Sequence, residues 1–414
     1  MAESNDSAGK LVRYARVGDA FTPGAPIDEL ALFAGRWAQI TEVVDAINQR
    51  GQHGVLYGER GVGKTSLANI LSQVFINHET RKPLWSVKVN CNTTDDYGSV
   101  WRNIFREMDR SEDYERQWSE SPPDPEDMRY LLQRLEERLL IVIDELDRLE
   151  DDLAISQIAD TIKTLSDHSV DVTLVLVGVA DAIDDLIGDH ASVERALTQV
   201  RMPRMSQAEL IEVLDKGLDR AELSMTDEAK ARIARLSEGL PFYTHTLALH
   251  AGQRTVVDDR DEISTVDVER AVGDAVGKAK HSITSAYQKA VRSPRKESQF
   301  AEVLLACALA PKDELGYFSA SAVRQPLSRI MGKNREITAF ARNLNKLADA
   351  SRGRVLQKTG QPRRFFYRFA NPLLQPFVIL SGLANGLIRE DLLTELQDQA
   401  RGSDDERGTL SMGL

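Results

Sequence analysis

The sequence predicts an α/β fold in which helices cover both faces of a parallel sheet, followed by a small all-helical lid and a C-terminal domain of helices and a hairpin. Three observations carry this prediction. Short apolar runs alternate with longer helical segments over the first half of the chain. From Ser206 onward, about sixty residues hold only amphipathic helical patterns. Three more amphipathic segments and two alternating ones follow near the C-terminus.

The strands are predicted from apolar runs that are too short for buried helices. These runs are Gly54–Tyr57, Trp85–Val89, Leu139–Ile143 and Val172–Val177. Because they are apolar at nearly every position rather than at alternate positions, both faces of the sheet should be covered. A helix is expected over Arg36–Gln49, where apolar residues recur every three or four positions, and another over Thr65–Phe75.

The domain boundaries follow from these patterns. At roughly 150 residues per domain, 414 residues correspond to about three structural units. We predict an N-terminal arm over residues 1–31, a core over 32–205, a helical lid with a connecting helix over 206–292, a C-terminal domain over 293–385 and a tail over 386–414. Ser264 and Asp267 have the spacing of a capping box, and the helix after them is expected to continue from Val268 to Tyr287.

A glycine-rich loop joins the first predicted strand to the next helix. Residues 58–65 (GERGVGKT) satisfy the pattern G-x-x-x-x-G-K-[ST] in the strand–loop–helix context that the pattern requires. The glycines let several backbone N–H groups face one anion, and the following helix adds the positive end of its dipole. The loop therefore predicts a P-loop nucleoside triphosphatase that binds a nucleoside triphosphate. The residues expected to contact the nucleotide are Gly58, Glu59, Arg60, Gly61, Val62, Gly63, Lys64, Thr65 and Ser66.

Two adjacent carboxylates end the strand at Leu139–Ile143. Side chains alternate along a strand, so Asp144 and Glu145 should point in different directions. We expect Asp144, with the Thr65 hydroxyl, to hold Mg²⁺, and Glu145 to polarise the attacking water while Lys64 contacts the phosphates. A solvated strand end is the alternative, and the glycine loop eighty residues earlier favours the functional interpretation.

Charge is distributed unevenly along the chain. The 52 Lys and Arg against 64 Asp and Glu give a net charge of −12, which argues against a general nucleic-acid coat. Residues 321–369 reverse this balance with twelve basic and two acidic residues, so a net charge of +10 in this stretch leaves −22 elsewhere. Such asymmetry is typical of an acidic body with a basic module that must find phosphates.

Several classes of protein are disfavoured by composition. Cys91 and Cys307 are too few and too distant for a disulfide framework or a metal cluster. The apolar stretch Val172–Ala180 is half the length needed to cross a bilayer, and the first residues show no secretory signal. We therefore expect a cytoplasmic protein with no membrane partner.

The basic stretch is typical of a winged-helix domain. Helices are expected over Ser298–Ala310, Ser321–Met331 and Glu336–Leu347, with hairpin strands at Arg354–Gln357 and Arg364–Phe369. If the third helix enters a major groove, duplex DNA would be the partner. The residues expected to contact it are Arg335, Arg342, Asn343, Lys346, Lys358, Arg363 and Arg364. The alternative is a winged helix that packs against protein.

The chain resembles the ATPases associated with diverse activities (AAA+), within them the origin-recognition-like and signal-transduction (STAND) branches. The resemblance spans roughly Leu32 to Ala271 and includes Leu32–Arg36, which looks like the segment that contacts the nucleotide base. Residues 191–195 (ASVER) are similar to the segment with the arginine finger, which implies that Arg195 acts on a neighbour's nucleotide and that the core self-associates. A plain surface arginine is equally compatible.

Two departures from the family pattern favour slow hydrolysis. Residues 178–181 (GVAD) lack an obvious polar sensor at the end of the fourth predicted strand. Residues 239–241 (GLP) stand where a second sensor arginine would be expected and resemble the Gly-x-Pro element of the STAND branch, which implies that Pro241 contacts nucleotide. Pro241 is also an ordinary first residue of a helix.

These features are compatible with three functions and disfavour a fourth. The first is an ATP-dependent switch associated with DNA, and the second is a STAND-like regulatory or defence ATPase whose basic module contacts a protein partner. The third is an accessory of DNA transposition or loading that needs a recruited partner. The fourth, a metabolic kinase, is disfavoured because the predicted lid leaves no visible pocket for an acceptor substrate.

Overall fold

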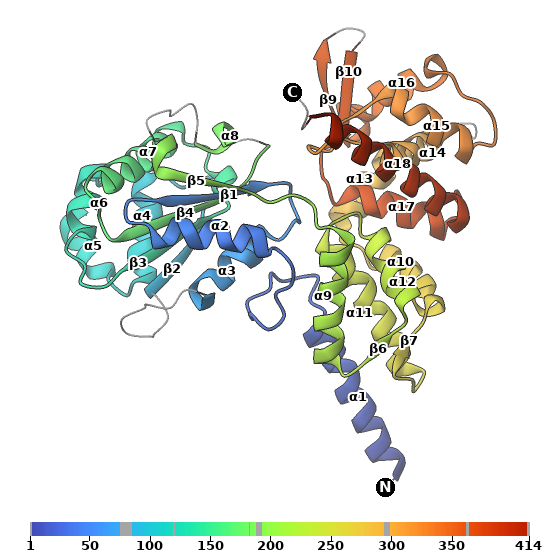
Figure 1. The fold of residues 1–414 in the computed structure, drawn as a ribbon, viewed down its shortest axis with the longest axis horizontal. Helices are drawn as coiled ribbons and strands as arrows, with labels where there is room; N and C mark the ends of the chain where they lie inside the picture. The colour runs from blue at the N-terminus through green and yellow to red at the C-terminus, as the bar shows by residue number, and fades with distance from the viewer. Residues whose placement is uncertain are drawn as a thin grey trace. The chain divides into compact units, whose positions relative to one another are not determined.

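The computed structural model contains two compact units. One consists of residues 22–216, and the other of residues 1–21 together with 217–414. The structure describes residues 2–74, 85–118, 121–181, 183–187, 193–293, 299–361 and 364–411. Figure 1 shows the sheet of the first unit and the helices of the second. No helix among these residues is long and apolar enough to span a membrane.

The first unit is built on a five-stranded sheet in the order β2-β3-β4-β1-β5, and all its strand pairs are parallel. The strands are β1 (His53–Gly58), β2 (Trp85–Asn90), β3 (Leu139–Asp144), β4 (Val172–Val179) and β5 (Leu197–Arg201). The four predicted strands and the predicted fold class are confirmed. The sequence analysis missed β5 because it lies at the sheet edge, where Thr198 and Gln199 interrupt the apolar pattern.

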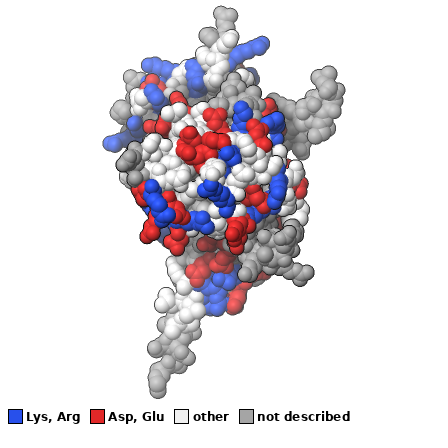
Figure 2. Space-filling model, turned by 90° about the vertical axis from the view of Figure 1, so that its left-hand side faces the viewer, with Lys and Arg blue, Asp and Glu red and all other residues white. Residues whose placement is uncertain are grey.

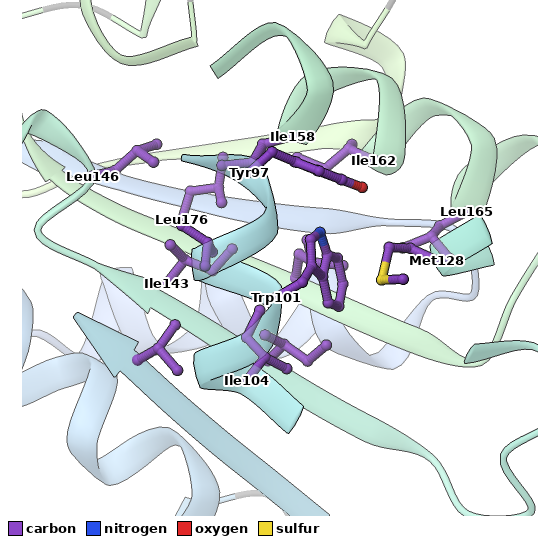
Figure 3. Close-up of a cluster of buried hydrophobic side chains, with 14 of the residues drawn as sticks. Tyr97, Trp101, Ile104, Met128, Ile143, Leu146, Ile158, Ile162, Leu165 and Leu176 are labelled. Atoms are coloured by element: carbon purple, nitrogen blue, oxygen red, sulfur yellow. The ribbon is translucent and has the colours of Figure 1, made fainter. Parts of the chain in front are cut away.

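Helices cover both faces of this sheet, as predicted. Figure 3 shows one face, where Trp101 of α4 and Ile158 of α7 pack over Ile143 and Leu176 of the strands. On the other face, α3 contacts β1, β3 and β4. The helices of this unit are α2 (Trp37–Asn48), α3 (Lys64–Val74), α4 (Tyr97–Glu107), α5 (Ser111–Trp118), α6 (Pro125–Leu132), α7 (Asp152–Asp167) and α8 (Asp184–Ile187), and α9 (Gln207–Ala221) begins in it.

The second unit begins with a helix that the sequence analysis did not assign. Residues Ala2–Ala20 of the predicted N-terminal arm form α1, which packs against α11 (Pro241–Val257). A small residue allows this contact, because a Cβ on Gly252 of α11 would lie 2.9 Å from Cγ1 of Val17 on α1. Lys10 and Asp259 form an ion pair of 2.8 Å at the exposed side. The helix α1 therefore packs within the second unit.

The lid is helical, with one two-residue parallel strand pair. Its further elements are β6 (Ser224–Met225), α10 (Asp227–Leu236), β7 (Glu262–Ile263), α12 (Thr265–Gly277) and α13 (His281–Val291). The helix predicted over Val268–Tyr287 is two helices, because Lys280 adopts an extended conformation (φ −53°, ψ 137°) before α13 begins. The strand pair is too short to leave a sequence signal.

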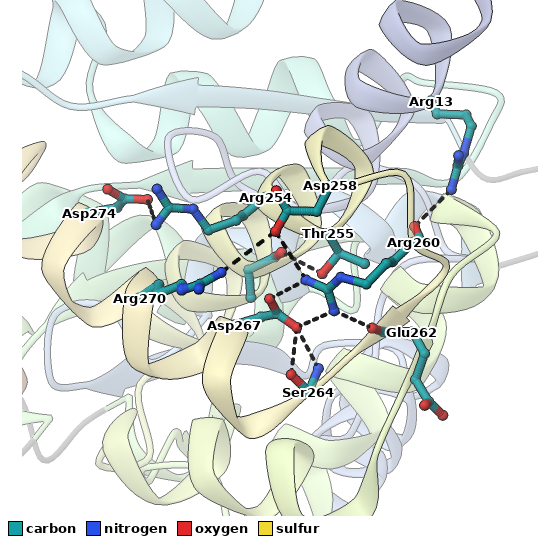
Figure 4. A network of polar contacts seen from close by, with 11 residues as sticks. Arg13, Arg254, Thr255, Asp258, Arg260, Glu262, Ser264, Asp267, Arg270 and Asp274 are labelled. Atoms are coloured by element: carbon teal, nitrogen blue, oxygen red, sulfur yellow. Dashed lines mark hydrogen bonds and ion pairs between the residues drawn. The ribbon is translucent and has the colours of Figure 1, made fainter.

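The predicted capping interaction at the start of α12 is confirmed and belongs to a larger polar network (Figure 4). The Asp267 carboxylate accepts hydrogen bonds from the backbone N–H (2.9 Å) and hydroxyl (2.7 Å) of Ser264, and from Arg260 Nη1 (2.9 Å). Burial opposes ionisation of this carboxyl, but the hydrogen bonds from Arg260 and Ser264 outweigh it and lower the pKa of Asp267 to about 2. The network ties the α11–α12 connection to the first turn of α12.

The C-terminal module, residues 299–384, contains the predicted helices and hairpin. Its elements are α14 (Phe300–Leu309), β8 (Phe318–Ser319), α15 (Ala320–Ile330), α16 (Ile337–Leu347), β9 (Leu356–Gln361), β10 (Arg364–Phe369) and α17 (Leu374–Ala384). The strands form an antiparallel sheet in the order β8-β10-β9. Gly360 (φ +96°) lies where a Cβ would meet the carbonyl oxygen of Arg364 at 2.3 Å, so the hairpin requires glycine there.

The C-terminal module and the lid interlock within the second unit. Glu238, at the end of α10, accepts hydrogen bonds from Gln375 of α17 (2.8 Å) and from Gln397 of α18 (Glu390–Ser411). The Tyr243 hydroxyl of α11 donates to the carbonyl oxygen of Leu373. These contacts surround residues 239–241, so the Gly-Leu-Pro segment lies beside the helices that follow the hairpin.

Candidate functional site

The glycine loop adopts a conformation that only glycine accommodates easily. It joins β1 to α3, and Gly58, Gly61 and Gly63 have φ values of +147°, +90° and +97°. A Cβ on Gly58 would also lie 2.5 Å from the carbonyl oxygen of Met202. The loop is therefore fixed both by its own dihedral angles and by the chain that leaves β5.

Lys64 begins α3 and is almost fully buried, with 7% of its surface exposed. Its ammonium donates to the carbonyl oxygens of Gly58 (2.9 Å) and Glu59 (2.8 Å). Burial lowers the pKa of Lys64 to about 8, against the opposing effect of Asp147, Asp144 and Glu59. At neutral pH the ammonium form still dominates, so the loop carries a fixed positive charge.

Thr65 and Asp144, predicted to hold a metal ion together, are brought together by the fold. Asp144 has the same strand parity as Leu140 and Val142, which places its side chain on the α3 side of the sheet. Its Oδ1 lies 3.5 Å from Thr65 Oγ1 and accepts the backbone N–H of Glu145 at 2.8 Å. Only 2% of Asp144 is exposed. A hydroxyl and a carboxylate oxygen are suitable ligands for Mg²⁺.

Lys88 is a charged neighbour of this pair that the sequence analysis missed. It lies on β2, and its Nζ forms an ion pair with Asp144 Oδ2 at 2.9 Å and donates to Asn69 Oδ1 at 2.6 Å. The signal was available, since a lysine inside an otherwise apolar strand predicts a buried partner. Asp144 is therefore neutralised by Lys88 on its Oδ2 side.

Glu145 lies beyond the end of β3, so the strand alternation that was expected to turn its side chain away from that of Asp144 does not apply to it. Its backbone is left-handed (φ +56°), and its half-exposed side chain pairs with Arg148 at 2.9 Å. Asp147, two residues on, accepts the backbone N–H of Val179 at 2.8 Å and so connects this turn to the end of β4. Glu145 is within reach of solvent, and its orientation is set by one surface ion pair.

The remaining loop residues divide between packing and exposed roles. Glu59 pairs with Arg204 at 2.7 Å, while Arg60 is exposed. The side chain of Val62 is fully buried. Ser66 Oγ accepts the backbone N–H of Ile27 at 3.1 Å. These contacts attach the loop to chain segments before α2 and after β5.

Arg195 lies away from the loop within the first unit, and Pro241 is not part of that unit. Arg195 precedes β5, at the amino end of the strands, whereas the loop follows the carboxyl end of β1. Its exposed side chain pairs with Asp167 of α7, and Ala191 and Ser192 of its motif lie outside the described residues. Pro241 belongs to the other unit, where it is the first residue of α11.

The predicted DNA contacts cluster on α16 and the hairpin. Arg342 and Lys346 are exposed on α16, Asn343 and Arg335 are half-buried, and Arg364 is exposed at the start of β10. Arg363 lies outside the described residues.

The hairpin is joined to α16 through a residue that the prediction omitted. Lys358 of β9 donates to Asn345 Oδ1 of α16 at 2.7 Å and lies 3.5 Å from the ring centroid of Phe365. Asn345 lies three residues after Arg342 on the same exposed face, and that spacing was the missed signal.

Part of the positive charge of this module is used inside the protein. Arg329 forms two hydrogen bonds to Glu395 of α18 (2.7 and 2.6 Å), and Arg324 lies 3.8 Å from Glu336. Arg352 donates to the carbonyl oxygen of Ala290 at 2.6 Å. Within the described chain, Arg342, Lys346 and Arg364 form no ion pair. The charge offered to a ligand is therefore smaller than the sequence count.

A hollow between β9 and the segment that follows α16 adds a further basic residue to this surface. Its volume is about 490 Å³, and its charged lining consists of Arg354, Lys358 and the acidic Asp349. By contrast, the face of the first unit in Figure 2 intersperses acidic and basic side chains. We call the surface formed by Arg342, Lys346, Arg354, Lys358 and Arg364 the basic face.

One protein-family model matches a part of the first unit. Residues 47–187, less than half of the chain, match the family model described as an AAA domain. No curated protein matches the sequence. The chain is similar to the ORC2 protein of Aeropyrum pernix, solved as ADPNP–ADP complexes, with 15% identity, 93% of this chain and 98% of that chain covered, and a TM-score of 0.50.

Two other solved structures are similar at lower scores. Cdc6p of Pyrobaculum aerophilum has 16% identity, with 90% and 99% of the two chains covered and a TM-score of 0.45. The ORC1 protein of Aeropyrum pernix, solved in complex with DNA, has 14% identity, with 91% and 97% covered and a TM-score of 0.45. The strand order, the glycine loop and the AAA-domain match agree that residues 22–216 have the P-loop NTPase fold.

Proposed function

We propose that this protein is a Mg²⁺-dependent ATPase that hydrolyses ATP slowly and acts as a molecular switch of the AAA+/STAND type. One observation carries the proposal. A buried lysine, a threonine hydroxyl and a buried aspartate converge where β1 meets α3, with 3.5 Å between Thr65 Oγ1 and Asp144 Oδ1. Lys64 would contact the β- and γ-phosphates, and Thr65 and Asp144 would hold Mg²⁺, which supplies charge neutralisation at the phosphates.

Glu145 is the residue expected to polarise the attacking water. Its ion pair with Arg148 lies at the exposed surface, and opening it for this role costs little. The absence of an obvious polar sensor in residues 178–181 (GVAD) supports slow hydrolysis. Arg195 remains a candidate to act on the nucleotide of a second copy, since its side chain is 72% exposed.

The output of the switch is proposed to be association with duplex DNA through the C-terminal module, which we assign as a winged helix. Three helices and a β8-β10-β9 sheet support this assignment, and the basic face supports DNA as the partner. Exposed arginines and lysines around a groove would contact phosphates and carry little base information. Contact with an acidic protein partner is the second candidate, since nothing in the basic face is specific to DNA.

Hydrolysis of ATP by three proteins tests the enzymatic part. Lys64→Ala should remove nucleotide binding, whereas Glu145→Gln should bind Mg–ATP like the parent and turn it over at least about 100-fold more slowly. Parent-like binding by Lys64→Ala, or parent-like turnover by Glu145→Gln, would contradict the site assignment.

A gel-shift titration with duplex DNA, with and without Mg–ATP, tests the output. We expect binding that weakens steeply with salt and changes with nucleotide. Lack of any shift at low salt would exclude DNA and favour a protein partner.

A further inference from the structure

Residues 33–36, which precede α2, form hydrogen bonds with one face of α9. Glu209, Glu212 and Lys216 are spaced by three and four residues and so lie on one side of that helix. Glu209 accepts the backbone N–H of Arg36 at 3.0 Å, and Glu212 accepts that of Gly35 at 3.0 Å. Lys216 donates to the carbonyl oxygen of Phe33. Successive backbone groups of residues 33–36 are thus held by α9, within the first unit.

The backbone at this point is held in a conformation that most residues avoid. Gly35 and Arg36 are both left-handed, with φ values of +67° and +64°. A Cβ on Gly35 would lie 3.0 Å from Glu209 Cβ, so this close approach requires glycine. A left-handed arginine persists only where the surrounding contacts over-determine it. The contacts with α9 are of that kind.

The side chain of Arg36 reaches from this segment to the phosphate-binding loop. Only 2% of Arg36 is exposed, and its Nη2 donates to the carbonyl oxygens of Val62 (2.9 Å) and Pro203 (2.6 Å). Its Nε is buried and has no hydrogen-bond partner among the described residues. Burying a guanidinium that is incompletely satisfied is costly. Arg36 therefore connects the phosphate-binding loop, residue 203 and α9, and its burial costs free energy that an apolar side chain would not cost.

Two further contacts join the same loop to the connection that leads into α9. Glu59 forms a 2.7 Å ion pair with Arg204, and both side chains are largely buried. Gly58 abuts the carbonyl oxygen of Met202. These contacts connect the phosphate-binding loop to residues 202–206, which lead directly into α9. The helix α9 ends at Ala221 and so contains residues of both units.

We propose that Arg36 is a positioning residue that couples the conformation of the phosphate-binding loop to that of α9, with the Glu59–Arg204 pair as a second link. Phosphates that bind to the N–H groups of the loop reorient its peptide units, and the carbonyl of Val62 belongs to one of them. Arg36 then moves with this carbonyl or releases it, and Glu209 transmits the change to α9. The inference rests on the proposed function, because it needs a nucleotide in the loop.

Hydrogen exchange of backbone amides in the full chain, with and without Mg–ATP, tests this coupling. In the parent protein, nucleotide should slow exchange in residues 58–66 and change exchange in residues 207–216 by about tenfold or more. At a concentration of Mg–ATP that saturates the variant, as established by calorimetric titration, Arg36→Met should lose the α9 response relative to the response of the loop. Arg36→Lys should recover the α9 response only in part, since one ammonium does not reproduce the guanidinium fork. Arg50→Met, which removes an exposed arginine paired with Asp171, is the control.

The outcomes separate this inference from the proposed function. A parent protein that takes up no Mg–ATP removes the proposed function itself. A parent that binds, together with Arg36→Met that gives a full α9 response, overturns only the coupling.

If Arg36→Met does not fold, Glu59→Gln, Arg204→Met and their double variant replace it. We expect each single variant to weaken the α9 response, and the double variant to lose no more than the worse single one. A full response in all three would overturn the proposal.

Discussion

The phosphate-binding loop and the basic face hold their charges in opposite ways. Lys64 and Asp144 are 7% and 2% exposed, and each has at least two polar partners within the fold. Arg342, Lys346 and Arg364 are exposed, and no ion pair with a described residue fixes them. The charged side chains of the first region are held in place by the fold, whereas those of the second are exposed and held by no ion pair with a described residue. Substitutions in the loop should therefore have large and local effects, and those on the basic face small and salt-dependent ones.

The largest effect is expected at Gly58. Gly58→Ala places a Cβ 2.5 Å from the carbonyl oxygen of Met202 at a φ of +147°, so the loop must shift. We expect the affinity for Mg–ATP to fall by about 100-fold, or about 2.7 kcal/mol, in a calorimetric titration. Gly273→Ala, on α12 with open space around its Cβ, is the control. Parent-like affinity would mean that the loop is not preorganised.

Lys88 tests the buried charge balance at Asp144. Lys88→Met removes the 2.9 Å partner of a buried carboxylate and should lower the free energy of unfolding by about 2 kcal/mol, less than for a fully buried pair because Lys88 is 28% exposed. Mg–ATP should reduce this loss, because the metal ion would replace the ammonium at Asp144. Thermal unfolding with and without Mg–ATP measures both, with the exposed Lys163→Met as control. A loss that Mg–ATP leaves unchanged would contradict the assignment of Asp144 to the metal.

Asp267 shows a preorganised charge outside the nucleotide site. Its pKa of about 2 lies below the unfolded value of about 3.9, so its contribution to stability is present above pH 4 and disappears as the pH falls toward 2. Asp267→Asn should cost at most about 2 kcal/mol at pH 7 and flatten the pH dependence of unfolding between pH 4 and 2. Asp274→Asn, 3.9 Å from Arg254, should do neither. Equal pH profiles for the parent and Asp267→Asn would contradict this account.

The smallest effect is expected on the basic face. Replacing Lys358 and Arg364 together by Gln should weaken duplex binding by less than about tenfold at moderate salt, evenly across sequences. The slope of log affinity against log salt should become shallower by about 2, since each phosphate contact contributes about 0.9. Replacing Lys278 and Arg389, two exposed residues outside the C-terminal module, removes the same charge as a control. An unchanged slope would remove the hairpin from the interface.

The features that the sequence predicted well are those that depend on the pattern of neighbouring residues along the chain. The strands His53–Gly58 and Leu139–Asp144 correspond to apolar runs that are too short for buried helices. The glycine loop between strand and helix has a recognisable spacing. Strand parity placed the side chain of Asp144, but it does not apply to Glu145, which lies beyond β3 in a left-handed conformation. The three helices and the hairpin of the C-terminal module followed from the same periodicities.

What the sequence could not predict depends on contacts between distant segments. Lys88 meets Asp144 only because β2 and β3 pair in one register, and Arg36 meets Val62 only because two left-handed residues turn it inward. The pairing of Arg329 with Glu395 joins residues sixty-six positions apart, and it neutralises one of the twelve basic residues counted in residues 321–369. The helix α1 carries a polar sequence and is stabilised by its contact with α11.

Calorimetric titration of the folded protein with Mg–ATP, compared between the parent, Lys64→Ala and Lys163→Ala, tests the central claim most directly. Lys64 supplies the buried charge of the loop, and Lys163 is an exposed lysine on α7 of the same unit. The account predicts saturable 1:1 uptake by the parent and by Lys163→Ala, and uptake weakened by more than about 100-fold for Lys64→Ala. Equal uptake by all three proteins, or none by the parent, would contradict it.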